Sequence, residues 1–131
     1  LFLDKLKDLH NASELQEKLN IKVSYWSQLA QSLSGGNQQK TVIAKWLSTK
    51  PEIIILDEPT KGIDVRSKSA VHEFMGELVE SGMSIIMISS ELPEILGMCD
   101  RVVVMYKGLI KNILDVSKTS SEEIVGLASG E

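Results

Sequence analysis

The first quarter of the chain has an apolar and polar pattern that predicts helices. Within residues 1–31 leucines recur at roughly helical spacing. The pattern is broken near Asn11-Ala12-Ser13, and Ser13 with Gln16 three positions later fits a capping box. The pattern therefore predicts two short helices with a break near residues 11–13.

A more amphipathic segment, from about residue 37 to residue 49, predicts a third helix. Its apolar residues recur at helical spacing, so we expect them to form a buried face. That face consists of Val42, Ile43, Trp46 and Leu47. Pro51 follows closely and would end the helix, because proline has no amide hydrogen to donate to the helical ladder.

The apolar pattern then becomes continuous. Residues 53–56 are consecutive isoleucines followed by a leucine, a run typical of a strand covered on both faces in a parallel sheet. Residues 84–89 repeat it, and between the two runs an apolar helix face extends from Val71 to Val79 and closes at Gly82. We therefore expect a strand, a helix and a second strand.

The last third of the chain predicts a short helix, a hairpin and a final helix. Pro93 suits the first turn of the short helix. Residues 101–106 and 109–114 form strands joined by a turn at 107–108, and residues 119–123 contain two overlapping capping boxes. Strands that alternate with helices indicate an α/β fold with a largely parallel sheet flanked by helices.

Composition and charge narrow the classes of function. The 131 residues are 43% hydrophobic and 24% charged, as in a soluble globular domain. A formal net charge of −4 gives no general attraction to nucleic acid, which we exclude as a main partner. Cys99 is the only cysteine, so we expect no internal disulfide. We expect no membrane-spanning run and no signal peptide, and the first residue, which is not Met, suggests a fragment.

The stretch LSGGNQQK, residues 33–40, allows two interpretations. Ser34 is a suitable N-cap, and Gly35 and Gly36 would then only add flexibility. Alternatively, adjacent glycines let backbone N–H groups approach an anion closely, and the positive end of the following helix adds to the attraction. The residues alone leave both a capped helix and a phosphate site open.

The stretch IIILDEPTKGID, residues 53–64, is open in the same way. A strand that ends at Asp57 puts a carboxylate at the carboxyl edge of the sheet, where α/β proteins bind ligands. There Asp57 would hold Mg²⁺ beside a phosphate, and Glu58 would act on an attacking water as a general base. The alternative is a strand that ends in a polar turn.

In this order the two stretches resemble the second half of an ATP-binding-cassette (ABC) ATPase domain, a P-loop NTPase-type fold. LSGG resembles the family signature, and LDEPT resembles its Walker B segment with the catalytic Glu. The spelling LSGGNQQK, followed by EPTKGIDV and SSELPEILGMCDRVVVM, is similar to the C-terminal cassette of bacterial sugar importers of the ribose and galactose type. The match is strong over residues 33–114 and weak at both ends.

The resemblance implies specific contacts for the signature. Ser34, Gly35 and Gly36 would contact the γ-phosphate of ATP bound to the opposite cassette. Asn37 and Gln38, in the first turns of the helix, would add further contacts to the nucleotide. The signature would thus serve a partner's site rather than its own.

The resemblance also implies roles for the acidic residues. Asp57 would support Mg²⁺ and Glu58 would act on the attacking water in the chain's own site. Asp64 matches the loop that passes between the two cassettes. ATP and Mg²⁺ are therefore the implied cofactors, and ATP hydrolysis coupled to sugar import is the implied activity of the complete protein.

Two departures from the family pattern limit these implications. Where the family has a catalytic His after the second strand, this chain has Ser90, and a hydroxyl cannot replace imidazole in the same way. No G-x-x-x-x-G-K-[ST] phosphate loop occurs in the chain. We therefore expect the C-terminal portion of a cassette that would not turn over ATP by itself.

The expected organisation and partners follow from the same resemblance. Residues 1–36 would end the helical signature subdomain, and residues 37–131 would form the C-terminal part of the ATPase core. The partners would be a second cassette, transmembrane permease subunits and, indirectly, a periplasmic sugar-binding protein, with the chain peripheral to the cytoplasmic face of the inner membrane. The alternative function is a catalytically degenerate regulatory cassette that completes a partner's site through its signature.

Overall fold

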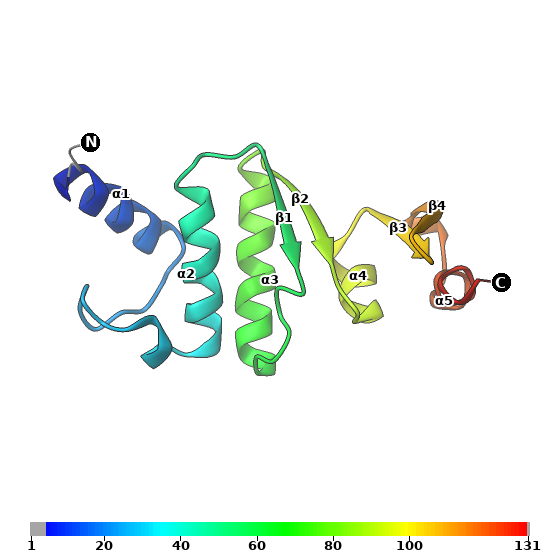
Figure 1. Ribbon diagram of the computed structural model, residues 1–131, viewed down its shortest axis with the longest axis horizontal. Coiled ribbons are helices and arrows are strands. Elements are labelled where there is room, and N and C mark those ends of the chain that lie inside the picture. The colour runs from blue at the N-terminus through cyan, green and yellow to red at the C-terminus, as the bar shows by residue number, and fades with distance from the viewer. Residues whose placement is uncertain (1–4, 131) are drawn as a thin grey trace. The chain divides into compact units, whose positions relative to one another are not determined.

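The computed structural model describes residues 5–130, and side chains from residue 9 onward. It divides at Ile88 and Ser89 into two compact units, each with its own helices and a two-stranded sheet. Figure 1 shows the order of the elements from α1 to α5. The α/β class predicted from the sequence is confirmed.

The first unit contains a parallel strand pair with a crossover helix. Its elements are α1 (Lys5–Lys18), η1 (Ala30–Ser32), α2 (Gly35–Leu47), β1 (Ile53–Asp57), α3 (Val65–Glu80) and β2 (Ser84–Ile88). Strand β1 pairs in parallel with β2, so that Ile53 lies opposite Ser84 and Asp57 lies opposite Ile88. Helix α3 stands between α2 and this sheet (Figure 1).

The core of the first unit comes mainly from one face of each element. Ile54 and Leu56 of β1 are buried, whereas their neighbours in the strand are exposed. The buried residues of the helices are Ile43, Ala44 and Leu47 of α2 and Val71, Phe74, Met75 and Leu78 of α3. Full burial of each large apolar side chain contributes roughly 1.5–3 kcal/mol, and these residues therefore hold the helices against the sheet.

The predicted break near residues 11–13 is wrong, because α1 continues through it to Lys18. Ser13 lies inside this helix and does not cap a second one. Gln16 instead donates a hydrogen bond from Nε2 to the carbonyl of Ile21, 2.9 Å away, and so holds the chain where it leaves α1. From Asn20 to Leu29 the chain is irregular rather than helical.

The prediction that residues 53–56 are covered on both faces is also wrong within the described part of the chain. Ile53 and Ile55 remain 59% and 64% exposed, because α3 is the helix that packs on the two-stranded sheet and it covers one face. Val42 and Trp46, expected in the core, are likewise more than half exposed on α2. The apolar pattern therefore predicted burial for one face of β1 and part of α2 that remain exposed in the described residues.

The second unit is a hairpin with a helix packed on it. Its elements are α4 (Leu92–Met98), β3 (Arg101–Tyr106), β4 (Leu109–Asp115), η2 (Val116–Lys118) and α5 (Ser121–Ser129). Val102, Val104 and Ile124 form its core. Lys107 and Gly108 both have positive φ, 48° and 79°, as a tight hairpin turn requires. The predicted strands and turn are confirmed, and this pair is antiparallel.

Candidate functional site

Ser34 lies at the N-terminus of α2, in the extended conformation of an N-cap residue (φ −60°, ψ 153°). Its side chain makes no capping hydrogen bond to the helix backbone. Instead, the Ser34 hydroxyl oxygen accepts a hydrogen bond of 3.0 Å from Nδ2 of Asn37. The Ser34 hydroxyl is therefore held by the side chain of Asn37 and is exposed at the N-terminus of α2.

Asn37 and Gln38 hold the loop that leads into α2. Oδ1 of Asn37 accepts the backbone N–H of Lys22 at 3.1 Å, which joins the helix to the irregular segment after α1. Nε2 of Gln38 donates to the carbonyl of Leu33 at 2.8 Å. Both residues were expected to contact nucleotide, and the structure adds that they position the segment around Ser34.

Gly35 and Gly36, at the start of α2, pack against Ile63 and Ser67, at the start of α3. A Cβ atom on Gly35 would lie 3.0 Å from a methyl carbon of Ile63, and one on Gly36 would lie 3.0 Å from Cβ of Ser67. Gly36 is also buried. The two glycines thus allow close packing between the signature and the segment that contains Asp64, in addition to any contact with a phosphate.

Asp64 is the N-cap of α3. Its Oδ1 accepts the backbone N–H of Ser67 at 3.0 Å, and its Oδ2 accepts the Ser67 hydroxyl at 2.6 Å. The Ser67 hydroxyl, followed by the Ser67 N–H, lowers the pKa of the Asp64 carboxyl below its ordinary value. The carboxylate is fully exposed and remains ionised at neutral pH, where it closes the first turn of the helix.

Asp57 and Glu58 lie at the carboxyl end of β1, as predicted. Asp57 is the last residue of the strand and is exposed. Glu58 is half-buried, and its backbone turns out of the strand with φ of 48°, in the left-handed region. Its N–H still donates to the carbonyl of Ile88 at 2.8 Å. For a residue other than glycine this conformation costs roughly 1–2 kcal/mol, and it separates the direction of Glu58 from that of Asp57.

Ser90 follows β2 and belongs to the second unit, where it is exposed. The adjacent Ser89 has the more extensive hydrogen bonds. Its hydroxyl donates to the carboxylate of buried Glu94 and accepts the N–H of Glu91 at 3.0 Å, which fixes the start of α4. Ser89 therefore orients the segment that contains Ser90.

The structure brings the signature and the Asp64 turn together, because Gly36 packs against Ser67, the residue that bonds Asp64. Asp57 and Glu58 begin the loop that leads to this turn. Sequence reasoning missed Ser67 and the backbone of Lys22 as supports of the site. Asp64 is a typical N-cap residue, whose carboxylate accepts the N–H of the residue three positions later, and this would have identified Ser67; no local pattern marks Lys22.

The carboxylates fit a magnesium ion that is held mainly by a phosphate ligand. In residues 5–130 no group of three or more His, Cys, Asp or Glu side chains is placed to hold a metal by itself. Mg²⁺ is commonly bound by one or two carboxylates together with substrate phosphates and water. A single exposed carboxylate at Asp57 is consistent with that type of site.

Replacing Ser67 with Ala is expected to raise the pKa of the Asp64 carboxyl toward its ordinary value, because the hydroxyl that favours the ionised form is removed. A carboxylate with a lowered pKa stabilises the folded state above its unfolded pKa, and this stabilisation is lost as the pH falls through the folded pKa. An NMR titration of the Asp64 carboxyl carbon measures the shift. Asp115, whose pKa is lowered in the same way by Ser117, should titrate unchanged in this variant and is the internal control.

Sequence comparison relates the chain to transporter ATPases. The pattern that defines the ABC transporter family matches residues 4–61. A ribose import ATP-binding protein, RbsA, of Jannaschia sp. (strain CCS1) is 54% identical over 98% of this chain and 25% of its own length. The RbsA protein of Bacillus cereus (strain ZK / E33L) is 50% identical over 90% of this chain and 24% of its own length. The chain therefore spans about a quarter of the curated relatives that it matches.

Solved structures with the same fold are also ABC cassettes. An ATP-binding cassette of an ABC transporter in its ADP conformation matches with a TM-score of 0.77 and 25% identity, over 98% of this chain and 49% of the other. An inward-facing putative metal-chelate type ABC transporter matches with a TM-score of 0.85 and 19% identity, over 98% of this chain and 51% of the other. None of the helices in the described residues has the length and apolar character needed to span a membrane.

Proposed function

The chain belongs to the ABC transporter family of ATP-binding proteins, and on that premise we propose that it forms the signature-containing, C-terminal portion of one cassette in a sugar importer. In the complete protein it takes part in binding and hydrolysing MgATP between paired cassettes. The residue roles below are part of this proposal.

One observation carries the proposal most directly. The start of α2, with Ser34, packs through Gly35 and Gly36 on the segment that contains Asp64. Two segments that are separated in sequence are therefore held as one surface, with an exposed hydroxyl beside the N-terminus of a helix. Helix N-termini attract phosphate because their N–H groups are unpaired and the helix dipole is positive there.

On this surface Ser34, Gly35 and Gly36 would bind the terminal phosphate of ATP held by the partner cassette. Asn37 and Gln38 would act mainly by holding the signature loop in place. Asp64 would belong to the segment that faces the partner, and its capping of α3 fixes the position of that segment.

The chain's own site would use the end of β1. Asp57 would support Mg²⁺, which supplies positive charge to the phosphates when it is bound. Glu58 would accept a proton from the attacking water, or position that water. The left-handed backbone of Glu58 supports this assignment, because strained conformations of this kind are concentrated at functional sites.

The substrate class and partners follow from the named relatives. Because the relatives at 50–54% identity are ribose import ATP-binding proteins, we propose ribose or a similar monosaccharide as the transported substrate. The chain would act with a second cassette and with permease subunits, and indirectly with a periplasmic sugar-binding protein. It would lie at the cytoplasmic face of the inner membrane.

The same proposal includes the domain limits. Residues 1–36 would end the helical signature subdomain, and residues 37–131 would form the C-terminal part of the ATPase core. The rest of the core, including a phosphate loop, would come from other parts of a longer protein. Coverage of about half of the solved cassettes by this chain supports this assignment.

A regulatory cassette that hydrolyses no ATP of its own remains the second candidate, and Ser90 is the residue that favours it. The hydroxyl of Ser90 replaces the imidazole expected by the family, so proton transfer at that position is not available in the physiological pH range. The importer is preferred because the match to ribose import ATP-binding proteins extends over nearly the whole chain.

Reconstitution tests the function as a whole. The complete protein with its permease, placed in vesicles, should take up labelled ribose only when MgATP is present on the side of the cassettes. A matched sample with ADP in place of ATP should show no uptake. Uptake of equal rate with ADP, or ATP hydrolysis that is unaffected by ribose and its binding protein, would contradict the proposed role in sugar import.

A further inference from the structure

A connected pair of hydrogen bonds ends on the Ser34 hydroxyl. The backbone N–H of Lys22 donates to Oδ1 of Asn37 at 3.1 Å, and Nδ2 of Asn37 donates to Oγ of Ser34 at 3.0 Å. Asn37 occupies the third position of α2, with Ser34 at the N-cap. Its side chain therefore joins the segment after α1 to the residue that faces the proposed phosphate.

The direction of both bonds is fixed by chemistry. A backbone N–H can only donate, so the Asn37 atom that faces Lys22 must be the carbonyl oxygen. The other end of the amide is then the NH₂ group, which can only donate. Ser34 Oγ must accept this bond, and the hydroxyl hydrogen of Ser34 is left to point elsewhere.

The orientation matters because a phosphate oxygen is an acceptor only. A serine hydroxyl can bind it only by donating its single hydrogen, and any neighbour that captures this hydrogen removes the contact. The Ser34 oxygen accepts no cap bond from the backbone N–H groups of α2, so it remains available to accept the bond from Asn37.

We propose that Asn37 is a positioning residue that sets the polarity of the Ser34 hydroxyl, so that the hydroxyl donates to a phosphate oxygen of the nucleotide. The inference rests on the proposed function, because it assumes that Ser34 faces that phosphate. It adds a role that depends on the amide of Asn37 rather than on its size. An isosteric carboxylate at this position retains the bond from Lys22 and reverses the bond to Ser34.

The test is Asn37→Asp in the complete protein with its permease, measured as steady-state MgATP turnover and as the melting temperature. In this variant Ser34 must donate its hydroxyl hydrogen to the new carboxylate. The hydrogen is then no longer available for a phosphate oxygen of the nucleotide. Turnover should fall about tenfold, the usual effect of one hydrogen bond to a charged group. The melting temperature should stay the same or rise, because a carboxylate is favourable in the first turn of a helix.

This combination separates positioning from a structural role. If Asn37 only held the loop, the variant would lower the melting temperature along with turnover, or would change neither. Gln39→Glu is the charge control, since it adds the same charge in the same part of α2 and leaves the pair Asn37 and Ser34 intact. Its loss of turnover should be less than that of Asn37→Asp.

A double-variant comparison decides whether Asn37 acts through Ser34. Ser34→Ala alone should lower turnover by about as much as Asn37→Asp, and the double variant should be no slower than Ser34→Ala. The inference is overturned if the two losses multiply, or if Asn37→Asp turns over ATP no more slowly than Gln39→Glu. If Ser34→Ala retains wild-type turnover, the contact of Ser34 with the phosphate fails, and that result contradicts the proposed role of Ser34 rather than the direction of the bond.

Discussion

Replacing Glu58 with Gln in the complete protein is expected to lower steady-state ATP turnover by at least about a hundredfold, because general-base catalysis contributes about 10²- to 10⁴-fold. Glutamine has nearly the size and shape of glutamate, but its neutral amide cannot accept the proton. The side chain of Glu58 is half-buried, and its backbone has a left-handed conformation at the end of β1. We expect glutamine to keep this backbone conformation. Turnover is measured with the permease present and at saturating MgATP.

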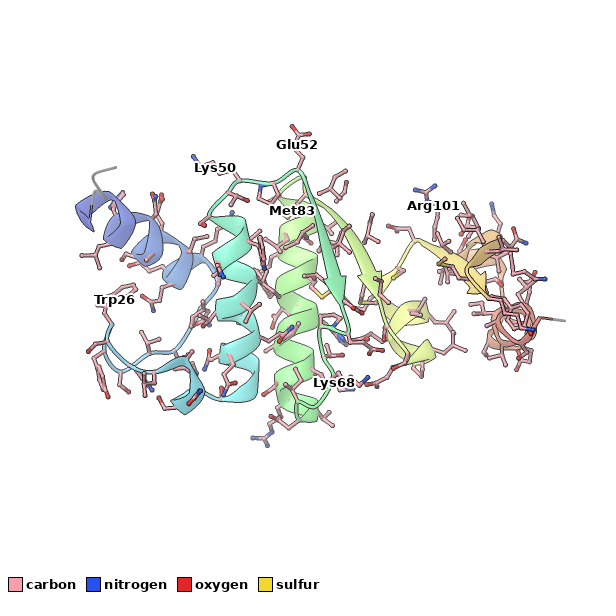
Figure 2. The ribbon with its side chains drawn as sticks, in the orientation of Figure 1. Trp26, Lys50, Glu52, Lys68, Met83 and Arg101 are labelled. Carbon is pink, nitrogen blue, oxygen red and sulfur yellow. The ribbon has the colours of Figure 1, made fainter. Side chains whose placement is uncertain are left out.

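Glu52→Gln is the matched control for this substitution. Glu52 lies before the amino end of the same strand, beside Lys50 on the connection from α2 (Figure 2). Its side chain is exposed, so the same chemical change should leave turnover near wild type. Near-normal turnover in Glu58→Gln as well would show that this cassette's own site is not the working one, and would favour the regulatory function.

The strands and the hairpin could be predicted from sequence because their signals are local. The isoleucine run of β1 and the turn Lys107-Gly108 each depend on neighbouring residues, and the structure confirms both. Ser120 caps α5, since its Oγ accepts the N–H of Glu123 with an N to Oγ distance of 3.2 Å, and the Glu123 carboxylate accepts the Thr119 hydroxyl. Each of these elements follows from backbone geometry and side-chain period alone.

The errors have a different physical origin. Asn11 and Ser13 are weak helix formers, but α1 continues through them, because this weak local preference is overcome by the surrounding helix. Exposed Ile53 and Ile55 show the opposite case, in which a strong apolar pattern finds no cover within the described residues. The apolar pattern of a sequence predicts which face of a helix or strand is suited to burial. Whether that face is buried depends on the other elements that pack against it.

The residues of the candidate site show the same difference between local signals and contacts that are distant in sequence. Ser34, Asp57 and Glu58 are recognisable because each stands at the end of a predicted element. The contact of Gly36 with Ser67, and that of Lys22 with Asn37, join residues that are distant in sequence. Such contacts depend on how α2 packs against α3 and against the loop after α1. The apolar pattern or motif of a single segment does not predict this packing.

Gly36→Val should have a large effect on both stability and turnover, because this glycine is where α2 meets α3. A new Cβ would lie 3.0 Å from Cβ of Ser67 and 3.4 Å from its Cα, so Ser67 must give way by a few tenths of an ångström. Overpacking of this kind costs about 1–3 kcal/mol of folding free energy. Because Ser34 precedes the same helix turn, displacement of its hydroxyl is expected to lower ATP turnover, toward the roughly hundredfold loss that a misplacement of about 1 Å causes.

Gly76→Val provides the matched control, since Gly76 lies inside α3 and a new Cβ there would have no atom within 4 Å apart from its chain neighbours and the backbone of its own helix. Valine is slightly preferred to glycine in a helix, so this variant should keep its stability and its turnover. In Gly36→Val, adding Ser67→Gly removes the clashing side chain and should restore part of the lost turnover. If the double variant is no better than Gly36→Val, the loss arises from the glycine backbone itself, such as its approach to a phosphate. Recovery would instead show that close packing on α3 is what places the signature.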